Sequence, residues 1–166
     1  MRLLSWCYEK VTKKPAPYFF RYSIVINLLK PIRKWMTNVV AANCPFNCIR
    51  ILIYRFCGFQ IGKKVFIGMK SYLDDTCYKK LIIKDRVTVS YGVYFACHGR
   101  KQSHYPIIIE EGAYIGMRAS VISKNRNGTK EGVTIGRNAM VGACALVNCD
   151  VPEGKTAVGI PCRIVD

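Results

Sequence analysis

The chain has 166 residues, which suits one compact domain that buries roughly two thirds of the surface of its unfolded chain. Lys and Arg number 26 against 10 Asp and Glu, and the net charge of +16 predicts an anionic partner: a phosphate-bearing cofactor, a lipid headgroup or a nucleic acid. Nucleic acid is the least favoured of the three, because the sequence contains no zinc finger, RNA-binding aromatic motif or recognition-helix pattern.

The nine cysteines are an odd number without a regular framework of spacings, which indicates a reducing compartment such as the cytoplasm. Cys44 and Cys48 have neither a second cysteine pair nor a histidine nearby, so no zinc site is expected. The segment from Met1 to Trp6 is too short and too polar at its flanks for a signal peptide. These features predict a cytoplasmic protein without a metal.

Residues 1–57 form a basic and aromatic segment that differs in composition from the rest of the chain. Ten Lys and Arg residues against one acid, Glu9, give the first sixty residues +9 of the total charge. Aromatic residues are interleaved with these cations, but no uninterrupted apolar run reaches the roughly 18 to 20 residues of a membrane-spanning helix. A spanning segment is therefore not expected.

Helices are predicted over 18–29, ending before Pro31, and over 31–40, with this proline in the first turn. Two roles fit this region. It caps the strand edges of the domain that follows, or it lies on an anionic membrane with aromatic side chains at headgroup depth, and both can hold together. A third helix is predicted over 43–56, capped by Asn43 and carrying on one side Ile49, Leu52, Ile53 and Phe56.

From residue 61 to residue 152 large apolar residues recur with a spacing of six, in four groups of three. A small or β-branched residue stands two positions before most of them, and a glycine often follows directly. The unit therefore reads small-x-aliphatic-Gly. The large apolar positions are Ile61, Ile67 and Leu73; Ile83, Val89 and Phe95; Ile109, Ile115 and Val121; and Ile135, Val141 and Val147.

Alternate side chains of a strand point to opposite faces, so the small and the large apolar residue of each unit face the same way. We expect the glycine to supply a permissive backbone for a sharp corner. A strand this short buries its inner face only by stacking on copies of itself, and three units make one triangular coil. Ordinary hairpins would instead need longer alternating runs joined by turn dipeptides.

The segments IGKKVFIG, IGMRASVI and IGRNAMVGACALV resemble the hexapeptide repeats of acyltransferases built on a left-handed parallel β-helix. The tail VPEGKTAVGIPCRIV is similar to the closing segment of that family's galactoside and maltose O-acetyltransferases. The resemblance covers 58–166 and implies an all-β domain, a left-handed parallel β-helix of about four coils, behind the helical segment 1–57. The left hand comes from the resemblance alone, because the usual rule for parallel crossovers predicts the right hand.

Two interruptions of the repeat are the expected functional loops: ACHGRKQSHYPI at 96–107, and the interval of fourteen residues from Val121 to Ile135. The first holds both histidines of the chain, His98 and His104. The family's catalytic histidine follows the corresponding strand, so the resemblance implies that His98 is the general base. His104 is expected to be an exposed loop histidine.

The length of one coil places His98 near Thr76, about 4.8 Å away in the pairing direction, and Asp74 and Asp75 flank that point. Leu-Asp-Asp also resembles the galactoside enzyme, whose second Asp binds the acceptor sugar. The resemblance therefore implies that Asp75, with Asp74 beside it, binds the substrate. Solvated carboxylates at a corner of the coil are the alternative.

Ile-Pro-Cys-Arg at 160–163 is close to the Val-Pro-Cys-Arg of the galactoside enzyme, whose arginine contacts coenzyme A, so Arg163 is the implied donor-binding residue. Ala143 matches the small residue of that enzyme's Ile-Gly-Ala-Gly, and Met117 stands where the family uses a backbone contact. Asn148 and Cys149 occupy the place of a Thr-Lys pair, without the lysine.

The resemblance implies an acetyl-CoA-dependent O-acetyltransferase that modifies a sugar or glycan hydroxyl in surface polysaccharide biosynthesis, without a metal. The γ-type carbonic anhydrases of the same fold need three zinc-binding histidines, and this chain has two. The alternatives are a membrane-bound, non-catalytic β-helix scaffold and an acyltransferase for an amino acid or amino sugar.

The expected partners are two further copies in a homotrimer, the acceptor, and an anionic membrane at whose inner face the protein is peripheral; nucleic acid is not expected. The outer faces of the coils support the trimer, because they carry more apolar residues than a monomer exposes, namely Phe66, Tyr94, Tyr114, Met140 and Leu146.

Overall fold

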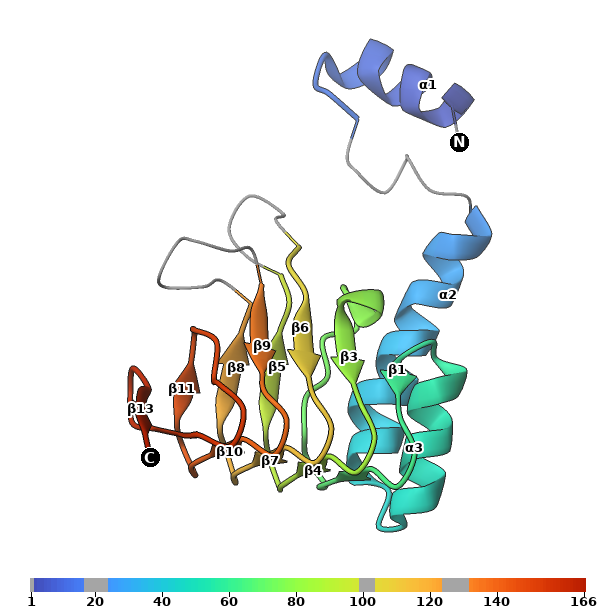
Figure 1. Cartoon of the computed structure of the whole chain (residues 1–166). Coiled ribbons are helices and arrows are strands. Elements are labelled where there is room, and N and C mark those ends of the chain that lie inside the picture. Colours follow the sequence, from blue (N-terminus) through green and yellow to red (C-terminus); the bar gives the residue numbers. More distant parts are fainter. Residues whose placement is uncertain (1, 17–23, 99–103, 124–131) are drawn as a thin grey trace. The chain divides into compact units, whose positions relative to one another are not determined.

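The computed structural model describes residues 2–16, 24–98, 104–123 and 132–166 (Figure 1). The chain forms two compact units, Met1–Trp35 and Met36–Asp166. The boundary between these units lies before the predicted division at 57/58, because a π-helical turn and a helix between residues 36 and 56 pack with the first strands.

The first unit contains α1 (Arg2–Thr12) and α2 (Ile24–Trp35). The predicted helix end before Pro31 is wrong, because Pro31 lies inside α2. A proline removes one backbone donor from a helix, and the bonds on either side can carry the helix past it. None of the described helices is long and apolar enough to cross a membrane.

The second unit begins with η2 (Met36–Ala41), a π-helical turn that follows α2 directly, and α3 (Asn47–Phe56). The predicted cap at Asn43 is wrong, since α3 begins four residues later and its N-cap position makes no side-chain hydrogen bond. Asn43 instead donates from Nδ2 to the carbonyl of Val39 (2.6 Å).

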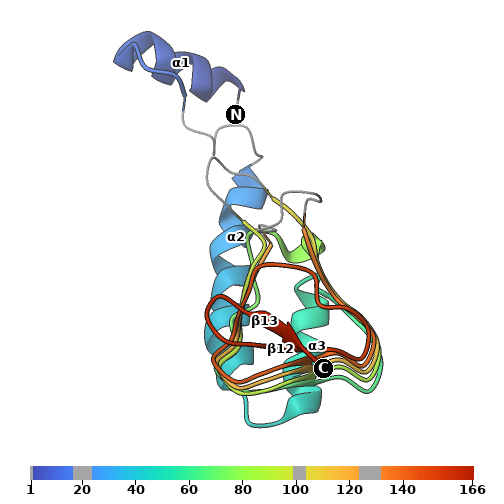
Figure 2. The same ribbon diagram turned by 60° about the vertical axis from the view of Figure 1, so that its left-hand side comes forward.

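The strands of the second unit form three sheets, in the orders β1-β3-β6-β9, β2-β4-β7-β10-β12-β13 and β5-β8-β11. Among the described strands every pair is parallel except β12 with β13. Seen nearly along the stack, successive turns of the chain superimpose (Figure 2). Besides the short helix η3 (Tyr78–Lys80), the elements are β1 (Gln60–Ile61), β2 (Phe66–Ile67), β3 (Leu81–Ile83), β4 (Thr88–Val89), β5 (Tyr94–Ala96), β6 (Ile107–Ile109), β7 (Tyr114–Ile115), β8 (Ser120–Ile122), β9 (Val133–Ile135), β10 (Met140–Val141), β11 (Leu146–Val147), β12 (Thr156–Val158) and β13 (Arg163–Val165).

The spacing of six is confirmed by the strand register. Ile67, Val89, Ile115 and Val141 are successive Cα partners along one sheet, and the other two sheets repeat this pattern. All twelve predicted positions except Ile61 are buried, and they form one continuous core. The parallel coil therefore follows from the sequence, whereas the number of coils stays a prediction.

The role predicted for the repeat glycines is wrong. Gly116 and its equivalents do not have positive φ, and the corner residues that do are mostly others, such as Arg118 and Asn138. A Cβ atom on Gly116 would lie 2.6 Å from the backbone nitrogen of Ala143 in the next coil. The repeat glycines are needed because neighbouring coils approach too closely for a side chain.

The helix α3 covers the open edge of the first coil. Arg50 is buried and donates from Nε to the carbonyl of Ile67 (2.7 Å), and Asn47 both donates to the carbonyl of Val65 (3.1 Å) and accepts from the backbone N–H of Ile67 (3.0 Å). These side chains satisfy strand groups that would otherwise lack partners. The predicted capping role is therefore confirmed for α3.

Candidate active site

His98 lies at a corner where segments one coil apart are in register. It follows β5, which pairs with β8, and β8 pairs with β11. Below β5, Tyr72 forms a parallel bridge with Tyr94. The segments that follow Leu73, Phe95, Val121 and Val147 therefore stack at the same corner, on strands whose inner residues are fully buried.

Asp74 is fully buried at this corner and binds the segment that carries His98. Its Oδ2 accepts hydrogen bonds from the backbone N–H groups of Cys97 (2.9 Å) and His98 (3.1 Å) and lies 2.5 Å from His98 Nδ1. Its Oδ1 accepts from the backbone N–H of Thr76 (3.0 Å). The side chain that binds His98 is thus Asp74, one of the two carboxylates expected to flank this point, because it reaches across to the neighbouring coil and lies behind the imidazole.

The contact with Asp74 determines which imidazole nitrogen is available for proton transfer. A carboxylate only accepts hydrogen bonds, so Nδ1 of His98 carries the shared proton and Nε2 keeps its lone pair. The His98 side chain is 44% exposed, whereas that of Asp74 is inaccessible. The pair can therefore take up a proton on Nε2 while Asp74 stabilises the resulting positive charge.

The other histidine is tied to the same corner. His98 and His104 form an antiparallel backbone bridge, and the backbone N–H of Tyr105 donates to the carbonyl of Cys97 (3.0 Å). Burial, with the nearby carboxylates, raises the pKa of Cys77 to about 11, so its thiol keeps its proton, and its Sγ lies 2.9 Å from Nδ1 of His104. His104 is exposed, as predicted, but it anchors the end of the loop.

Asp75 lies beside Asp74, and polar groups from two elements meet at its carboxylate. Its Oδ1 accepts from Asn38 Nδ2 in η2 (3.3 Å) and from the hydroxyl of Tyr72 (3.4 Å). Burial, and next the negative charge of Asp74 and Asp75, raises the pKa of Tyr72, so its hydroxyl remains a donor. The alternative of solvated corner carboxylates is wrong, because Asp75 is only 8% exposed and Asp74 is fully buried.

The five residues predicted for the donor lie at three places. Met117 and Ala143 are exposed at one corner of adjacent coils, where the backbone N–H of Cys144 donates to the carbonyl of Met117 (2.8 Å). Asn148 and Cys149 follow β11 at the corner that also carries His98. Arg163 is exposed in β13, directly after Cys162, whose Sγ lies 3.5 Å from that of Cys149.

Three residues at this site were missed by the sequence analysis: Asn38, Tyr72 and Cys77. Tyr72 and Cys77 flank Leu-Asp-Asp, so polar residues around that motif could have indicated them. Asn38 gave no signal, because its contact with Asp75 spans 37 residues and depends on how η2 packs.

Parts of both predicted loops, 99–103 and 124–131, lie outside the described residues, and with them the cations Lys124, Arg126 and Lys130. Within the described ranges there is no group of three or more His, Cys, Asp or Glu side chains placed to hold a metal ion.

No family model matches the chain. The serine acetyltransferase of Bacillus licheniformis is 36% identical over 110 residues, which are 65% of this chain and 45% of that protein. The galactoside O-acetyltransferase of Escherichia coli is 28% identical over 121 residues, covering 64% of this chain and 56% of that protein. The chain thus spans about half the length of the curated relatives it matches.

Among solved structures, a hexapeptide-repeat acetyltransferase from Vibrio cholerae, in complex with acetyl-coenzyme A, superimposes with a TM-score of 0.64 at 21% identity. The match covers 87% of this chain and 89% of that one. The fold of these structural relatives is a left-handed parallel β-helix, the handedness that the family resemblance implied.

Proposed function

We propose that the chain is a hexapeptide-repeat acyltransferase, a family supported by its repeat, its relatives and its fold, and that it is an acetyl-CoA-dependent O-acetyltransferase. The observation that carries this proposal is the buried carboxylate of Asp74, 2.5 Å from Nδ1 of a half-exposed histidine at the end of β5. A non-catalytic scaffold would have no need of an imidazole oriented in this way.

In the proposed reaction His98 Nε2 takes the proton of the acceptor hydroxyl as its oxygen attacks the thioester carbonyl of acetyl-CoA. Asp74 stabilises the imidazolium and holds the ring in the tautomer that leaves Nε2 free. Breakdown of the tetrahedral intermediate breaks the carbon–sulfur bond, and the imidazolium returns the proton to the sulfur. The products are an acetyl ester and coenzyme A as a free thiol.

For the acceptor we propose a sugar or glycan hydroxyl, as in surface polysaccharide biosynthesis. Asn38 donates one N–H to Asp75, and its amide has a second N–H and an oxygen, while the Tyr72 hydroxyl oxygen can still accept a hydrogen bond. Donors and acceptors side by side suit neighbouring hydroxyl groups. The serine acetyltransferase relative supports a second candidate, a hydroxyl amino acid, whose ammonium group would bind the same carboxylate.

For the donor we propose that acetyl-CoA is contacted at three places: by Met117 and Ala143 at their corner, by Asn148 and Cys149 at the corner that carries His98, and by Arg163 in the closing segment. The exposed guanidinium of Arg163 and the net charge of +16 suit the phosphates of coenzyme A. Arg163→Ala should therefore raise the KM for acetyl-CoA and leave the KM for the acceptor unchanged.

We also propose a homotrimer. Phe66 of β2, Tyr114 of β7 and Met140 of β10 are 46%, 41% and 50% exposed along one sheet, an apolar face suited to a neighbouring copy. Light scattering on the purified protein tests this, and a monomer at every concentration would contradict it.

An acceptor screen tests the proposed activity. Purified protein is incubated with acetyl-CoA and a panel of sugars, glycan fragments and hydroxyl amino acids, and loss of the thioester absorbance is followed. Acetyl-CoA should also raise the melting temperature. If neither acetyl-CoA binding nor turnover with any hydroxyl acceptor is found, the scaffold alternative replaces the enzyme.

A further inference from the structure

The outward side of α3 is strongly apolar, although α3 already buries an apolar side. Its inner residues Ile51 and Tyr54 are buried against the first coil. Three exposed apolar residues of α3 lie away from these inner residues, and two more are exposed in the segments before it, one in η2 and one at the N-cap of α3. We call these five residues the α3 outer face. It consists of Val39 (48% exposed), Phe46 (62%), Ile49 (45%), Leu52 (65%) and Phe56 (87%).

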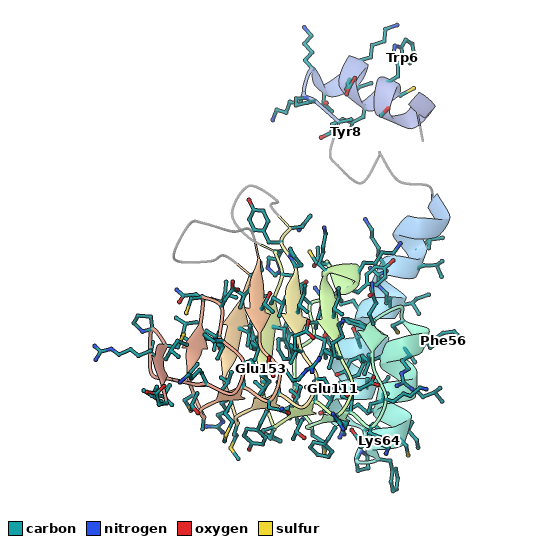
Figure 3. The ribbon with its side chains drawn as sticks, viewed as in Figure 1. Trp6, Tyr8, Phe56, Lys64, Glu111 and Glu153 are labelled. Carbon is teal, nitrogen blue, oxygen red and sulfur yellow. The ribbon has the colours of Figure 1, made fainter. Side chains whose placement is uncertain are left out.

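Helices with apolar residues on all sides occur where both sides are covered. Figure 3 shows Phe56 directed away from the strands, at the end of the second unit where α3 covers the first coil. The spacing of Ile49, Leu52 and Phe56 at i, i+3 and i+7 places them in one stripe. This stripe cannot serve the core, because the core contacts of α3 are made by the opposite side.

The charge of the surrounding sequence indicates what covers the α3 outer face. Between Glu9 and Asp74 the chain contains twelve Lys and Arg residues and no acidic residue. In the second unit Arg55, Lys63, Lys64 and Lys70 from this stretch are all exposed. A second copy of this face would bring like charges together, whereas an anionic lipid surface complements both the apolar stripe and the cations.

We propose that the α3 outer face docks on an anionic lipid membrane, a role that goes beyond the proposed catalytic function. Its apolar side chains enter the boundary between headgroups and acyl chains, and the flanking cations bind the lipid phosphates. Val39 of this face follows Asn38 in η2, and Asn38 binds Asp75, so η2 connects the docked surface with the acceptor side of the active site.

The first unit carries a second membrane-binding feature when it is considered by itself. Leu28, Ile32 and Trp35 are exposed on α2 with the spacing i, i+4 and i+7. In α1, Trp6 is exposed and Lys10 Nζ lies 4.5 Å from its ring centre, a pairing suited to headgroup depth. Two weak membrane-binding features on one chain, the α3 outer face and the exposed residues of the first unit, give a higher membrane affinity than either alone.

Flotation of the full chain with lipid vesicles tests the docking surface separately from catalysis. The vesicles contain phosphatidylglycerol and phosphatidylcholine, or phosphatidylcholine alone, at low and high salt. We expect binding to the anionic vesicles that weakens with salt. Phe56→Glu should lower the partition coefficient by at least about tenfold, since it removes an aromatic side chain that would enter the bilayer and adds a charge that anionic lipids repel. The double variant Leu52→Glu/Phe56→Glu should abolish binding.

Ile160→Glu is the matched control, because it makes the same charge change at a residue that is 73% exposed in the closing segment. It should change the partition coefficient by less than about twofold. Melting temperature and light scattering are recorded for every variant. The proposal is overturned if the chain does not float, if it binds neutral vesicles equally, or if Phe56→Glu binds like Ile160→Glu. A smaller oligomer in Leu52→Glu/Phe56→Glu without vesicle binding by the wild type would instead make this face an interface between copies.

Discussion

The role of Asp74 as the residue that orients His98 can be tested with a double-mutant cycle built from Asp74→Asn and His98→Ala. Asp74 accepts hydrogen bonds from three backbone N–H groups and from His98 Nδ1. An asparagine in its place has one oxygen that can accept and one NH₂ group that can only donate. This NH₂ group would face at least one of the present donors, so that at least one hydrogen bond would be lost. At about 1 to 2 kcal/mol for each lost bond to a charged group, Asp74→Asn should lower the free energy of unfolding by about 2 to 4 kcal/mol.

The effect on catalysis should be larger than the effect on stability. Without the carboxylate the imidazolium loses its stabilising partner, and Nε2 is no longer held as the free acceptor. We expect kcat to fall about 10²- to 10⁴-fold, equivalent to about 3 to 5 kcal/mol of barrier, with the KM for acetyl-CoA unchanged. His98→Ala should lower kcat by a similar factor and cost only about 1 to 2 kcal/mol of stability, since one of four bonds to Asp74 is lost.

The cycle distinguishes a positioning residue from one that binds substrate. Because Asp74 acts through His98, Asp74→Asn should reduce kcat by less than about threefold in the His98→Ala background. Asp75→Asn serves as the control: its Oδ1 accepts hydrogen bonds from Asn38 and Tyr72, and as an acceptor-binding residue it should mainly raise the acceptor KM. If instead the fold-losses in kcat of the two single variants multiply in the double variant, Asp74 acts on the substrate directly, as the resemblance alone had implied.

Three further predictions concern stability, measured by chemical denaturation. Gly116→Ala should lower the free energy of unfolding by about 3 kcal/mol, because its methyl group would meet the backbone of the next coil. The control Gly154→Ala, at a glycine with φ +69 and no atom within 4 Å of an added Cβ, should cost about 1 kcal/mol. Equal losses in the two variants would contradict the role of close approach. Arg50→Met should lower the free energy of unfolding by about 3 to 5 kcal/mol by leaving the carbonyls of Ile67 and Cys44 unpaired, and an unchanged stability would show that α3 does not cap the coil. The free energy of unfolding should fall as pH rises from 9.0 towards about 11, because folded Cys77 retains a proton that the unfolded chain releases. Cys77→Ser should make this fall less steep. An identical pH dependence in the variant would refute the raised pKa of Cys77.

The repeat made the coil predictable from sequence. Within one coil the large buried residues are six positions apart and fall on successive faces, so the middle members of the four groups, Ile67, Val89, Ile115 and Val141, form one column. His98 could be located for the same reason, since it directly follows one of these strands. The helix boundaries predicted from Pro31 and Asn43 were wrong, because the packing of neighbouring residues outweighed the boundary preference of these single residues.

The contacts between coils and between helix and coil were decided only by the tertiary structure. The length of a coil indicates which residues are neighbours to within about two positions, and this is too coarse to distinguish Asp74 from Thr76 as the partner of His98. That choice depends on a buried carboxylate that finds four donors at one corner. The repeat glycines are explained in the same way, by the distance between coils, which a pattern along the chain does not contain. Asn38 reaches Asp75, and the apolar stripe of α3 faces outward, because Arg50 and Asn47 bind the strand edges and thereby fix which side of the helix is turned to the coil.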